Sequence, residues 1–529
     1  MNAKVPELDR WDTGRWTRRS VLVTLGGGAL AAAFDVFGNP RPPTLPQCLG
    51  PGPAPHERID AHVHIFNGTD LQIAGFLKTA VSNEYPEFAP LLHLIADPLQ
   101  WFTWHFAPKA KQELEHLAHL IDARHGGKGF TADGVAGMRQ RDRAETDAQY
   151  ERFLLEQLQR RKVRTAVSNL LRRSKTAPPG LLLRLQRAPK TGPEARSLAR
   201  AIDQATGVPV FDYLYPYFCY RYDNFLELVE QFTCRGSLPI DTFIALMLDF
   251  DEPLGQGHAT ASPIPDQVAV MSRISELSRG HLLVAAPYCP LKDAAHNGAS
   301  LKNVTDAWTK PGFVGAKMYP PMGFSPFGNT NSRVEDALAA FYHECIQEDA
   351  VVIAHAGPSN CISAGSCLYP GPVGWRKALE HVLTTEKAPL RASLGHFGGP
   401  FDTKSQIQTW PECFLKLMSQ PYGERLYADL AYANEVLDPT QRQYCITRLT
   451  GLLKGSVLAD RLMYGTDWLM LGLESHWRDY EQCMQIVIQG AEQQSGIAGF
   501  SGRFFGINAR ACLDLSSNGS LARRNTMTL

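Results

Sequence analysis

Short runs of consecutive apolar residues, separated by segments with helical periodicity, dominate the second half of the chain. A run without alternating polar residues is typical of a strand buried on both faces, as in a parallel sheet covered by helices. With an earlier run near the N-terminus, the pattern predicts strands at 59–65, 242–249, 281–287, 313–319, 350–355, 391–396, 426–430 and 461–467. Eight such strands alternating with helices close into a barrel, so the predicted fold is an α/β (β/α)8 TIM barrel.

A long segment between the first and second predicted strands has helical character instead. Apolar residues recur there at helical spacing, as at Leu114, Leu117, Leu120 and Ile121. We therefore expect a large helical insertion at the top of the barrel. The predicted organisation is a first barrel strand at 56–67, the insertion at 68–237, the remainder of the barrel at 238–515 and a flexible tail at 516–529.

The N-terminus has the pattern of an export signal. Several arginines precede an apolar, Gly- and Ala-rich run at 21–34, and Ala31–Ala33 offers small residues for cleavage. Thr17–Leu22 looks like a twin-arginine signal, which exports proteins that have already folded. With the Pro-rich linker that follows, the predicted signal and linker span 1–55. We expect a periplasmic protein without a membrane span in the mature chain; an uncleaved anchor is the alternative.

The cysteines fit an exported protein but do not require one. The eleven cysteines include no Cys-x-x-Cys pair, which argues against a cysteine zinc site. Cys361 and Cys367 bracket a short Gly/Ser loop and could form a disulfide outside the cytoplasm. For most of the others, a buried free thiol is the simpler interpretation.

Composition narrows the class of partner. The chain has 529 residues, a formal net charge of +0 and 44% hydrophobic residues, which is ordinary for a soluble globular protein. A balanced charge gives no reason to expect nucleic acid or an acidic surface as the main partner. We interpret the Trp and Phe residues at 101–106 as core or as a contact between copies in a homo-oligomer.

Polar residues close several of the predicted apolar strands. His62 and His64 are two apart, so an extended strand points both to one face, where two imidazoles can chelate a metal ion. The other polar residues that close strands are Lys317, His355, His396 and Asp467. Each alone could be a hydrogen-bonded core residue or a helix cap. Because chemistry in such barrels lies at the carboxyl ends of the strands, six together favour an active site.

This set of strand ends resembles the amidohydrolase superfamily, and most closely its amidohydrolase-related branch of metal-dependent TIM-barrel enzymes. The resemblance covers about 58–65 and then 238–513. The stretches that carry it are Ile59–His64, Gly315–Pro320, Ile353–Ala356, Leu394–Gly399, Tyr464–Trp468 and Phe505–Arg510. The helical insertion has no counterpart that we can match, so substrate size does not follow from compact relatives.

The resemblance implies a metal site. It implies His62, His64 and His355 as metal ligands, with Asp467 completing the set. A divalent cation, with zinc expected, lowers the pKa of a bound water and polarises a carbonyl. Asp467 would act as the catalytic group that takes a proton and passes it to the leaving group.

Two further residues leave the number of metal ions open. His396 would act in catalysis by orienting or polarising the substrate, or would bind a second metal. In relatives with two metals, the lysine at the position of Lys317 is carboxylated and bridges them. The related branch mostly uses one metal, so we expect one ion, and two if Lys317 is carboxylated.

The expected function is metal-dependent hydrolysis of a C–N, ester or lactone bond in a small molecule. The alternative is non-oxidative decarboxylation of a small carboxylic acid, which relatives in the same branch catalyse with a one-metal site. A decarboxylase needs a cation for the departing carboxylate, and the candidates are Arg58, Arg221 and Arg333. A third interpretation, a binding protein without turnover, is disfavoured because both His396 and Asp467 are present.

Overall fold

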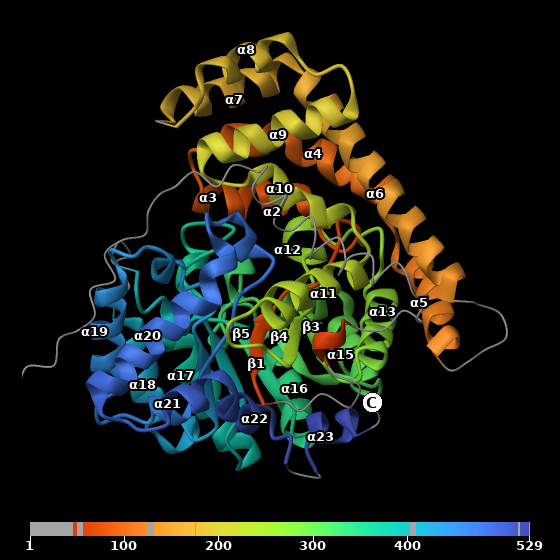
Figure 1. Cartoon of the computed structure of the whole chain (residues 1–529). Helices are drawn as coiled ribbons and strands as arrows, with labels where there is room; N and C mark the ends of the chain where they lie inside the picture. The colour runs from red at the N-terminus through yellow and green to blue at the C-terminus, as the bar shows by residue number, and fades with distance from the viewer. Residues whose placement is uncertain are drawn as a thin grey trace, which may run out of the picture. The chain divides into compact units, whose positions relative to one another are not determined.

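The computed structural model describes residues 46–49, 57–124, 132–174, 176–402, 409–516, 519–527 and 529 (Figure 1). The predicted export signal lies outside these described residues. Contacts divide the chain into two units, Met1–Thr44 with His119–Arg141 and Leu45–Ala118 with Asp142–Leu529. Of the first unit, only the end of α5 and the beginning of α6 are described. The barrel and the candidate site belong entirely to the second unit.

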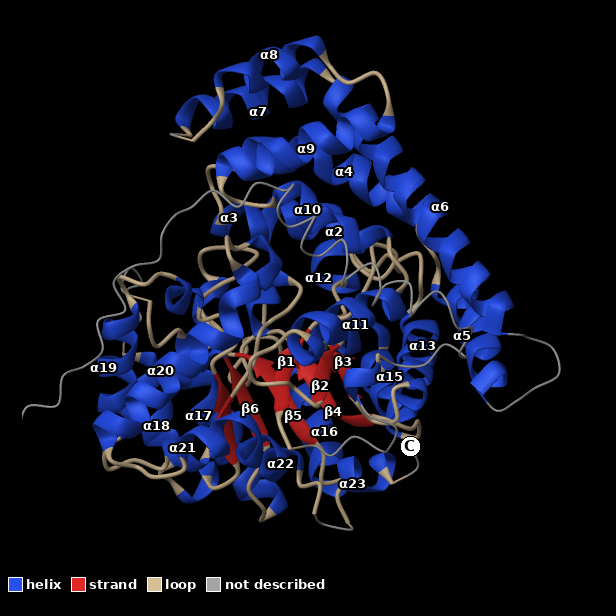
Figure 2. Cartoon of the chain, viewed as in Figure 1, coloured by secondary structure: helices blue, strands red, loops and turns tan. Residues whose placement is uncertain are grey.

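Eight parallel strands, ordered β1 to β8, form the centre of the second unit (Figure 2). The sheet closes on itself, because Ala61 N donates a hydrogen bond to Tyr464 O at 2.9 Å and Val63 forms a parallel bridge with Trp468. The predicted (β/α)8 barrel is confirmed. The strands are β1 Ile59–Val63, β2 Thr242–Leu246, β3 Leu282–Tyr288, β4 Phe313–Met318, β5 Val351–His355, β6 Ala392–Gly395, β7 Leu426–Asp429 and β8 Leu462–Met463.

Helices follow the strands in the alternation that a parallel barrel requires, because each crossover must return the chain to the same end of the sheet. Figure 2 shows helices packed around the red strands. From β2 onward they are α12 Asp251–Gly255, α13 Ile264–Leu277, α14 Pro290–His296, α15 Ala299–Trp308, α16 Ser332–Gln347, α17 Pro372–Glu386, α18 Trp410–Met418, α19 Arg442–Leu453, α20 Tyr480–Ser495, α21 Phe500–Gly502, α22 Asn508–Leu513 and α23 Leu521–Thr526.

Several strands end earlier than the apolar runs predict, and for two of them this changes where a candidate residue lies. β6 stops at Gly395 and β8 at Met463, so His396 and Asp467 lie in the segments that follow. His396 has a φ of 67° and Asp467 a φ of 56°, which an extended strand cannot accommodate. His396 and Asp467 therefore lie just beyond the sheet. The apolar pattern of the strands does not predict their left-handed backbone conformation.

The C-terminal residues differ from the flexible tail expected for 516–529. Leu521–Thr526 forms α23, in which Leu521 and Ala522 are buried. Asn525 Nδ2 donates hydrogen bonds to Trp308 O at 2.9 Å and Phe313 O at 2.8 Å, at the beginning of β4. Ala522 joins an apolar cluster with strand residues such as Val314, which explains why this segment is ordered.

The segment between β1 and β2 is helical throughout its described secondary structure. The helices are α2 Ile73–Phe76, α3 Ser82–Glu84, α4 Ala89–Phe106, α5 Ala110–Arg124, α6 Ala132–Gln159, α7 Arg161–Arg173, α8 Pro179–Arg187, α9 Gly192–Thr206, α10 Val210–Leu214 and α11 Arg221–Val229. Phe102 is buried against Phe153 and Phe218, while Trp101 is 52% exposed. Part of the 101–106 aromatic run is therefore core.

Two disulfides are present among the described residues. One joins Cys48 to Cys234, close to the beginning of β2, and the other joins Cys361 to Cys367, as the sequence allowed. The remaining described cysteines are free, and all but Cys413 are buried.

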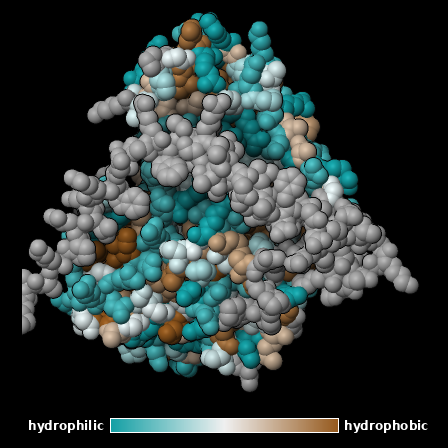
Figure 3. Space-filling view, viewed as in Figure 1, coloured by the Kyte–Doolittle hydropathy of each residue, from teal (hydrophilic) through white to brown (hydrophobic). Residues whose placement is uncertain are grey.

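The surface shown in Figure 3 is mainly hydrophilic, and its hydrophobic (brown) residues form small separate patches. Among the described residues, no helix is long and apolar enough to cross a membrane.

Arg221, which the sequence offers as a candidate for binding a substrate carboxylate, instead forms buried ion pairs within the insertion. Its guanidinium is buried and donates to both oxygens of Asp70 and, at 2.7 Å, to Glu113 Oε2. It also donates to Thr69 Oγ1 at 3.1 Å and Ser262 Oγ at 3.3 Å. Because Ser262 lies just before α13, this network ties the insertion to the barrel.

We predict that Arg221→Leu destabilises the protein by about 3–5 kcal/mol, because it leaves the buried carboxylates of Asp70 and Glu113 without their cation. Urea unfolding followed by circular dichroism measures this change. Arg235→Leu, which removes an exposed pair with Glu230, is the matched control and should cost at most about 1 kcal/mol. Equal unfolding midpoints for the two variants would contradict the structural role of Arg221.

Candidate metal centre

Donor atoms from three separate parts of the chain converge at the carboxyl ends of the strands. One ligand atom each from His62, His396 and Asp467 lie within 4.8 Å of one another. His64 Nε2 is 3.2 Å from Asp467 Oδ1. All four residues are at most 8% exposed. The structure thus brings His62 of β1 and His64, which directly follows β1, together with the two residues that follow β6 and β8.

Unusual backbone holds the two residues that follow strands. Left-handed φ at a non-glycine residue costs about 1–3 kcal/mol, and both His396 and Asp467 carry it. Asp467 N donates to His62 O at 2.7 Å, which keeps its segment against β1. A side chain at Gly465 would meet His62 Cβ and Ala431 Cβ at 2.9 Å, so only glycine permits this approach.

The imidazoles are oriented through their Nδ1 atoms. His62 Nδ1 lies 3.1 Å from Asp429 Oδ2, His64 Nδ1 lies 2.8 Å from Leu246 O, and His396 Nδ1 lies 2.9 Å from Ala431 O. Each partner is an acceptor, so Nδ1 carries the proton and Nε2 keeps its lone pair. Metal-binding histidines are fixed in this way, by a hydrogen bond from the nitrogen that does not bind the metal.

His355 lies beside this cluster in a different arrangement. Its ring centre is 4.3 Å from that of His396 and 4.7 Å from that of Tyr319, on which it stacks. Its Nε2 is 3.2 Å from Ser359 Oγ, whereas its buried Nδ1 has no hydrogen-bond partner among the described residues. A proton on Nδ1 would be a buried, unsatisfied donor. We therefore place the proton on Nε2, which leaves a lone pair on Nδ1.

Lys317 is the cation of the centre. Its Nζ is 3.3 Å from His62 Nε2 and 5.6 Å from the ring centre of Tyr319. Burial lowers the pKa of Lys317 to about 8, although the charges of Asp429 and Asp467 act in the opposite direction. Its amine is therefore easier to deprotonate than an ordinary lysine, and a neutral amine is the form that can be carboxylated. Whether it bridges two metals stays a prediction.

The charge states suit a cation. Burial, with the nearby positive charge of Lys317, holds the pKa of His62 well below its usual value, and burial does the same for His355. Burial tends to raise the pKa of Asp467, but its interactions with His64 and His62 outweigh this effect and lower it. Neutral imidazoles beside an ionised carboxylate are the donor set of a zinc site, so these residues fit a divalent metal ion.

Two site residues were missed in the sequence. Asp429 accepts from His396 N at 2.9 Å as well as from His62, and burial raises its pKa. Asp60 accepts from His62 N at 3.1 Å and from the hydroxyl of Thr466 at 2.6 Å, while burial raises its pKa to about 7. Asp429 closes the apolar run 426–430 as the other candidates close theirs, so the same signal could have found it.

The arginine candidates do not reach the centre. Arg58 precedes β1 and donates to Pro239 O at 3.4 Å, at the opposite end of the barrel. Arg333 is exposed in the first turn of α16, and Arg221 is held in the network described above. Lys317 is thus the one cationic candidate from the sequence that lies among the donors.

The insertion covers the barrel mouth through a shared carboxylate. Glu474 Oε1, which follows β8, accepts from Tyr85 OH at 2.8 Å, from Tyr432 OH at 2.6 Å and from Asn434 Nδ2 at 3.1 Å. Tyr85 and Tyr432 also contact each other through their hydroxyls. Tyr85 belongs to the insertion, whereas Tyr432 follows β7 and Glu474 follows β8. This cluster therefore joins the insertion to two loops at the carboxyl end of the barrel.

A cavity of about 760 Å³ adjoins the centre without containing its donors. Its walls come from the insertion and from the segment after β8, which includes Trp468 next to Asp467. Tyr213 also lines it; burial raises the pKa of this tyrosine, and the charge of Asp467 adds to the effect. The volume is in the range of small-molecule sites.

No family model and no curated protein matches the sequence. The solved structures that match the chain include the three described next. A probable 2-pyrone-4,6-dicarboxylic acid hydrolase from Acinetobacter baumannii has 12% identity over 55% of this chain and 88% of its own, with a TM-score of 0.34. A 2,6-dihydroxybenzoate decarboxylase from Rhizobium has 17% identity over 58% of this chain and 93% of its own, with a TM-score of 0.36.

The third structure, a 2,6-dihydroxybenzoate decarboxylase in complex with 2,6-dihydroxybenzoate, has 18% identity over 58% of this chain and 92% of its own, with a TM-score of 0.36.

We predict that Asp429→Asn raises the dissociation constant for Zn²⁺ roughly 10–100-fold, because the amide cannot accept on both sides as the carboxylate does. Competition with a chromophoric chelator measures the constant. Asp438→Asn, on the connection after β7, is the matched control and should bind as the unchanged protein does. Equal affinity for both variants would show that Asp429 does not support a metal ligand.

Proposed function

We propose that this protein is a metal-dependent hydrolase of the amidohydrolase superfamily that cleaves a C–N, ester or lactone bond in a small molecule. The observation that carries the proposal is the convergence of His62, His396 and Asp467 at the carboxyl ends of a parallel barrel. His64 and His355 lie within the same group of side chains. The motifs that resemble the superfamily fall on these same positions.

The side chains of the site can take separate roles in hydrolysis. A divalent cation bound there would polarise the substrate carbonyl and acidify an attacking water. Asp467, with a lowered pKa, is ionised at neutral pH and can accept the proton of that water. His396 is held by Ala431 O, so its Nε2 can orient or polarise the substrate. The low exposure of both groups keeps bulk water from the reaction.

We further propose that the resident ion is Zn²⁺ and that one ion binds per chain. Nitrogen and carboxylate donors without thiolates support a borderline metal of this kind. A second ion would need the carboxylated form of Lys317, and its pKa of about 8 makes the amine available for that modification.

Decarboxylation is the second candidate, and one observation favours it. The Lys317 ammonium lies buried among the donors, 3.3 Å from His62 Nε2, where it could pair with the carboxylate of an acid substrate. The metal would then hold other substrate oxygens, and Asp467 would deliver or remove a proton at carbon. The two functions would use the same site. Hydrolysis adds water to an acyl carbon, whereas decarboxylation breaks the bond to a carboxylate and releases CO2.

We propose that the protein is exported to the periplasm through its twin-arginine-type signal. The two disulfides, Cys48–Cys234 and Cys361–Cys367, support this location because such bonds persist in oxidising compartments. We also propose that the half-exposed Trp101 on α4 contacts another copy of the chain in a homo-oligomer.

Activity should depend on the metal and on Asp467. We predict that chelation abolishes turnover of an ester, lactone or amide substrate and that one equivalent of Zn²⁺ per chain restores it.

Asp467→Asn should lower kcat roughly 10²–10⁴-fold by removing the proton acceptor. Asp479→Asn, with its side chain 62% exposed, is the control and should keep full activity.

Product analysis in ¹⁸O-labelled water separates the two candidate functions. Incorporation of one ¹⁸O atom into the product supports hydrolysis. Release of CO2 from a carboxylic acid without label incorporation would replace it by decarboxylation. Full activity of Asp467→Asn would contradict both mechanisms.

A further inference from the structure

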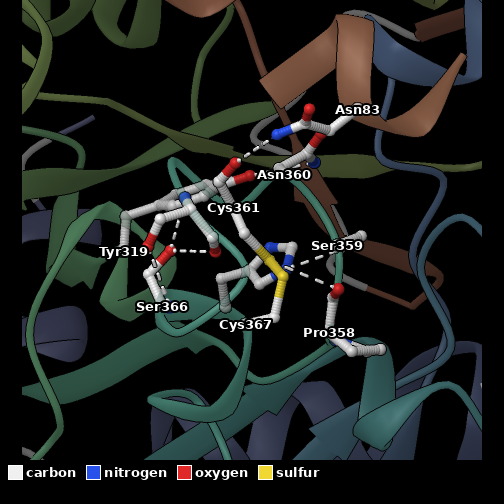
Figure 4. Close-up of a disulfide and its surroundings, with 10 residues drawn as sticks. Asn83, Tyr319, Pro358, Ser359, Asn360, Cys361, Ser366 and Cys367 are labelled. Carbon is white, nitrogen blue, oxygen red and sulfur yellow. Dashed lines mark hydrogen bonds between the residues drawn. A yellow bond between two sulfur atoms is a disulfide. The ribbon is translucent and has the colours of Figure 1, made fainter. Parts of the chain in front are cut away.

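The loop between β5 and α17, which begins just after His355, contains a disulfide (Figure 4). Cys361 and Cys367 are the bonded pair. Between them, Ser363 and Ser366 exchange backbone and side-chain hydrogen bonds of 2.9–3.2 Å, which make a compact turn. The loop is therefore a rigid unit and not an extended connection.

This unit is anchored on two other parts of the barrel mouth. Ile362 N donates to Pro321 O at 3.3 Å, after β4. Asn83 Nδ2, from the insertion, donates to Cys361 O at 3.3 Å, as Figure 4 shows. The disulfide loop thus joins the β4 end, the β5 end and the insertion.

The two residues just before the disulfide contact the environment of His355. Ser359 Oγ lies 3.2 Å from His355 Nε2. Asn360 Nδ2 donates to Tyr319 OH at 3.1 Å, and Tyr319 stacks on the His355 ring. His355 is thereby held on its edge by a hydroxyl and on its face by an aromatic ring, and the disulfide loop controls both contacts.

We propose that Ser359 is a positioning residue for metal binding by His355, and that the Cys361–Cys367 disulfide keeps it in place. The Ser359 hydroxyl accepts a hydrogen bond from His355 Nε2–H and fixes the tautomer whose buried Nδ1 keeps its lone pair. None of the other histidines of the centre depends on a side-chain hydroxyl, since they use Asp429 and backbone carbonyls. The inference rests on the proposed metal site.

The alternative is that the disulfide only stabilises the fold. That role would predict an effect on unfolding and none on the metal. The contacts favour positioning, because Ser359 and Asn360, the two residues before the bond, both point to the His355 environment.

The test uses Co²⁺ binding to the full chain, with the visible absorption spectrum of the bound ion as a readout of its ligands. We expect Ser359→Ala to weaken Co²⁺ binding roughly 10-fold or more and to shift the visible bands, as loss of a residue that orients a ligand does. Ser359→Thr keeps the hydroxyl and should restore both. The double variant Cys361→Ser/Cys367→Ser should weaken binding in the same direction.

The matched control is Cys48→Ser/Cys234→Ser, which removes the other disulfide near the beginning of β2 and should leave Co²⁺ affinity and spectrum unchanged. Near-ultraviolet circular dichroism establishes that each variant is folded. Unchanged affinity and spectrum in Ser359→Ala would overturn the positioning role while leaving the metal site intact. If the unchanged protein bound no Co²⁺, both the inference and the proposed function would fail.

Discussion

The hydrogen bond between Asp429 and His62 is the interaction on which the rest of the centre depends. It joins β7 to β1 across the barrel mouth, and the same carboxylate accepts from the backbone of His396. Three strands are thereby tied to one buried acid. Buried polar groups need hydrogen-bond partners, and the Nδ1 atoms of His62 and His396 find theirs in Asp429 and Ala431 O. Their Nε2 lone pairs are therefore left on the side where the donor atoms converge.

Burial of charge also explains the departures from regular structure. Asp60 satisfies the backbone of His62 and the Thr466 side chain, which lets the chain turn after β8 and present Asp467 with a left-handed φ. Strain at two residues of the site is retained because surrounding contacts over-determine it. The insertion adds the Glu474 cluster and the disulfide loop above the same mouth.

The barrel could be predicted because its signal is local: continuous apolar runs alternate with helices, and polar residues such as His355 close them. Asp429 carries the same signal, a polar side chain near the end of an apolar run, but it was not among the predicted site residues. The pairing of Arg221 with Asp70 and Glu113 could not be predicted, since partners far apart in sequence meet only through the fold of the insertion. The ordered C-terminal helix was missed for the same reason, because its buried face is recognised only against the beginning of β4.

The central claim is that the strand-end residues bind one divalent metal ion. Anomalous diffraction at the zinc edge, from crystals of the protein loaded with Zn²⁺, tests it most directly. We expect one peak at about 2.0–2.2 Å from nitrogen atoms of the clustered histidines and an oxygen of Asp467. A zinc peak elsewhere on the chain, with none among these residues, would contradict it.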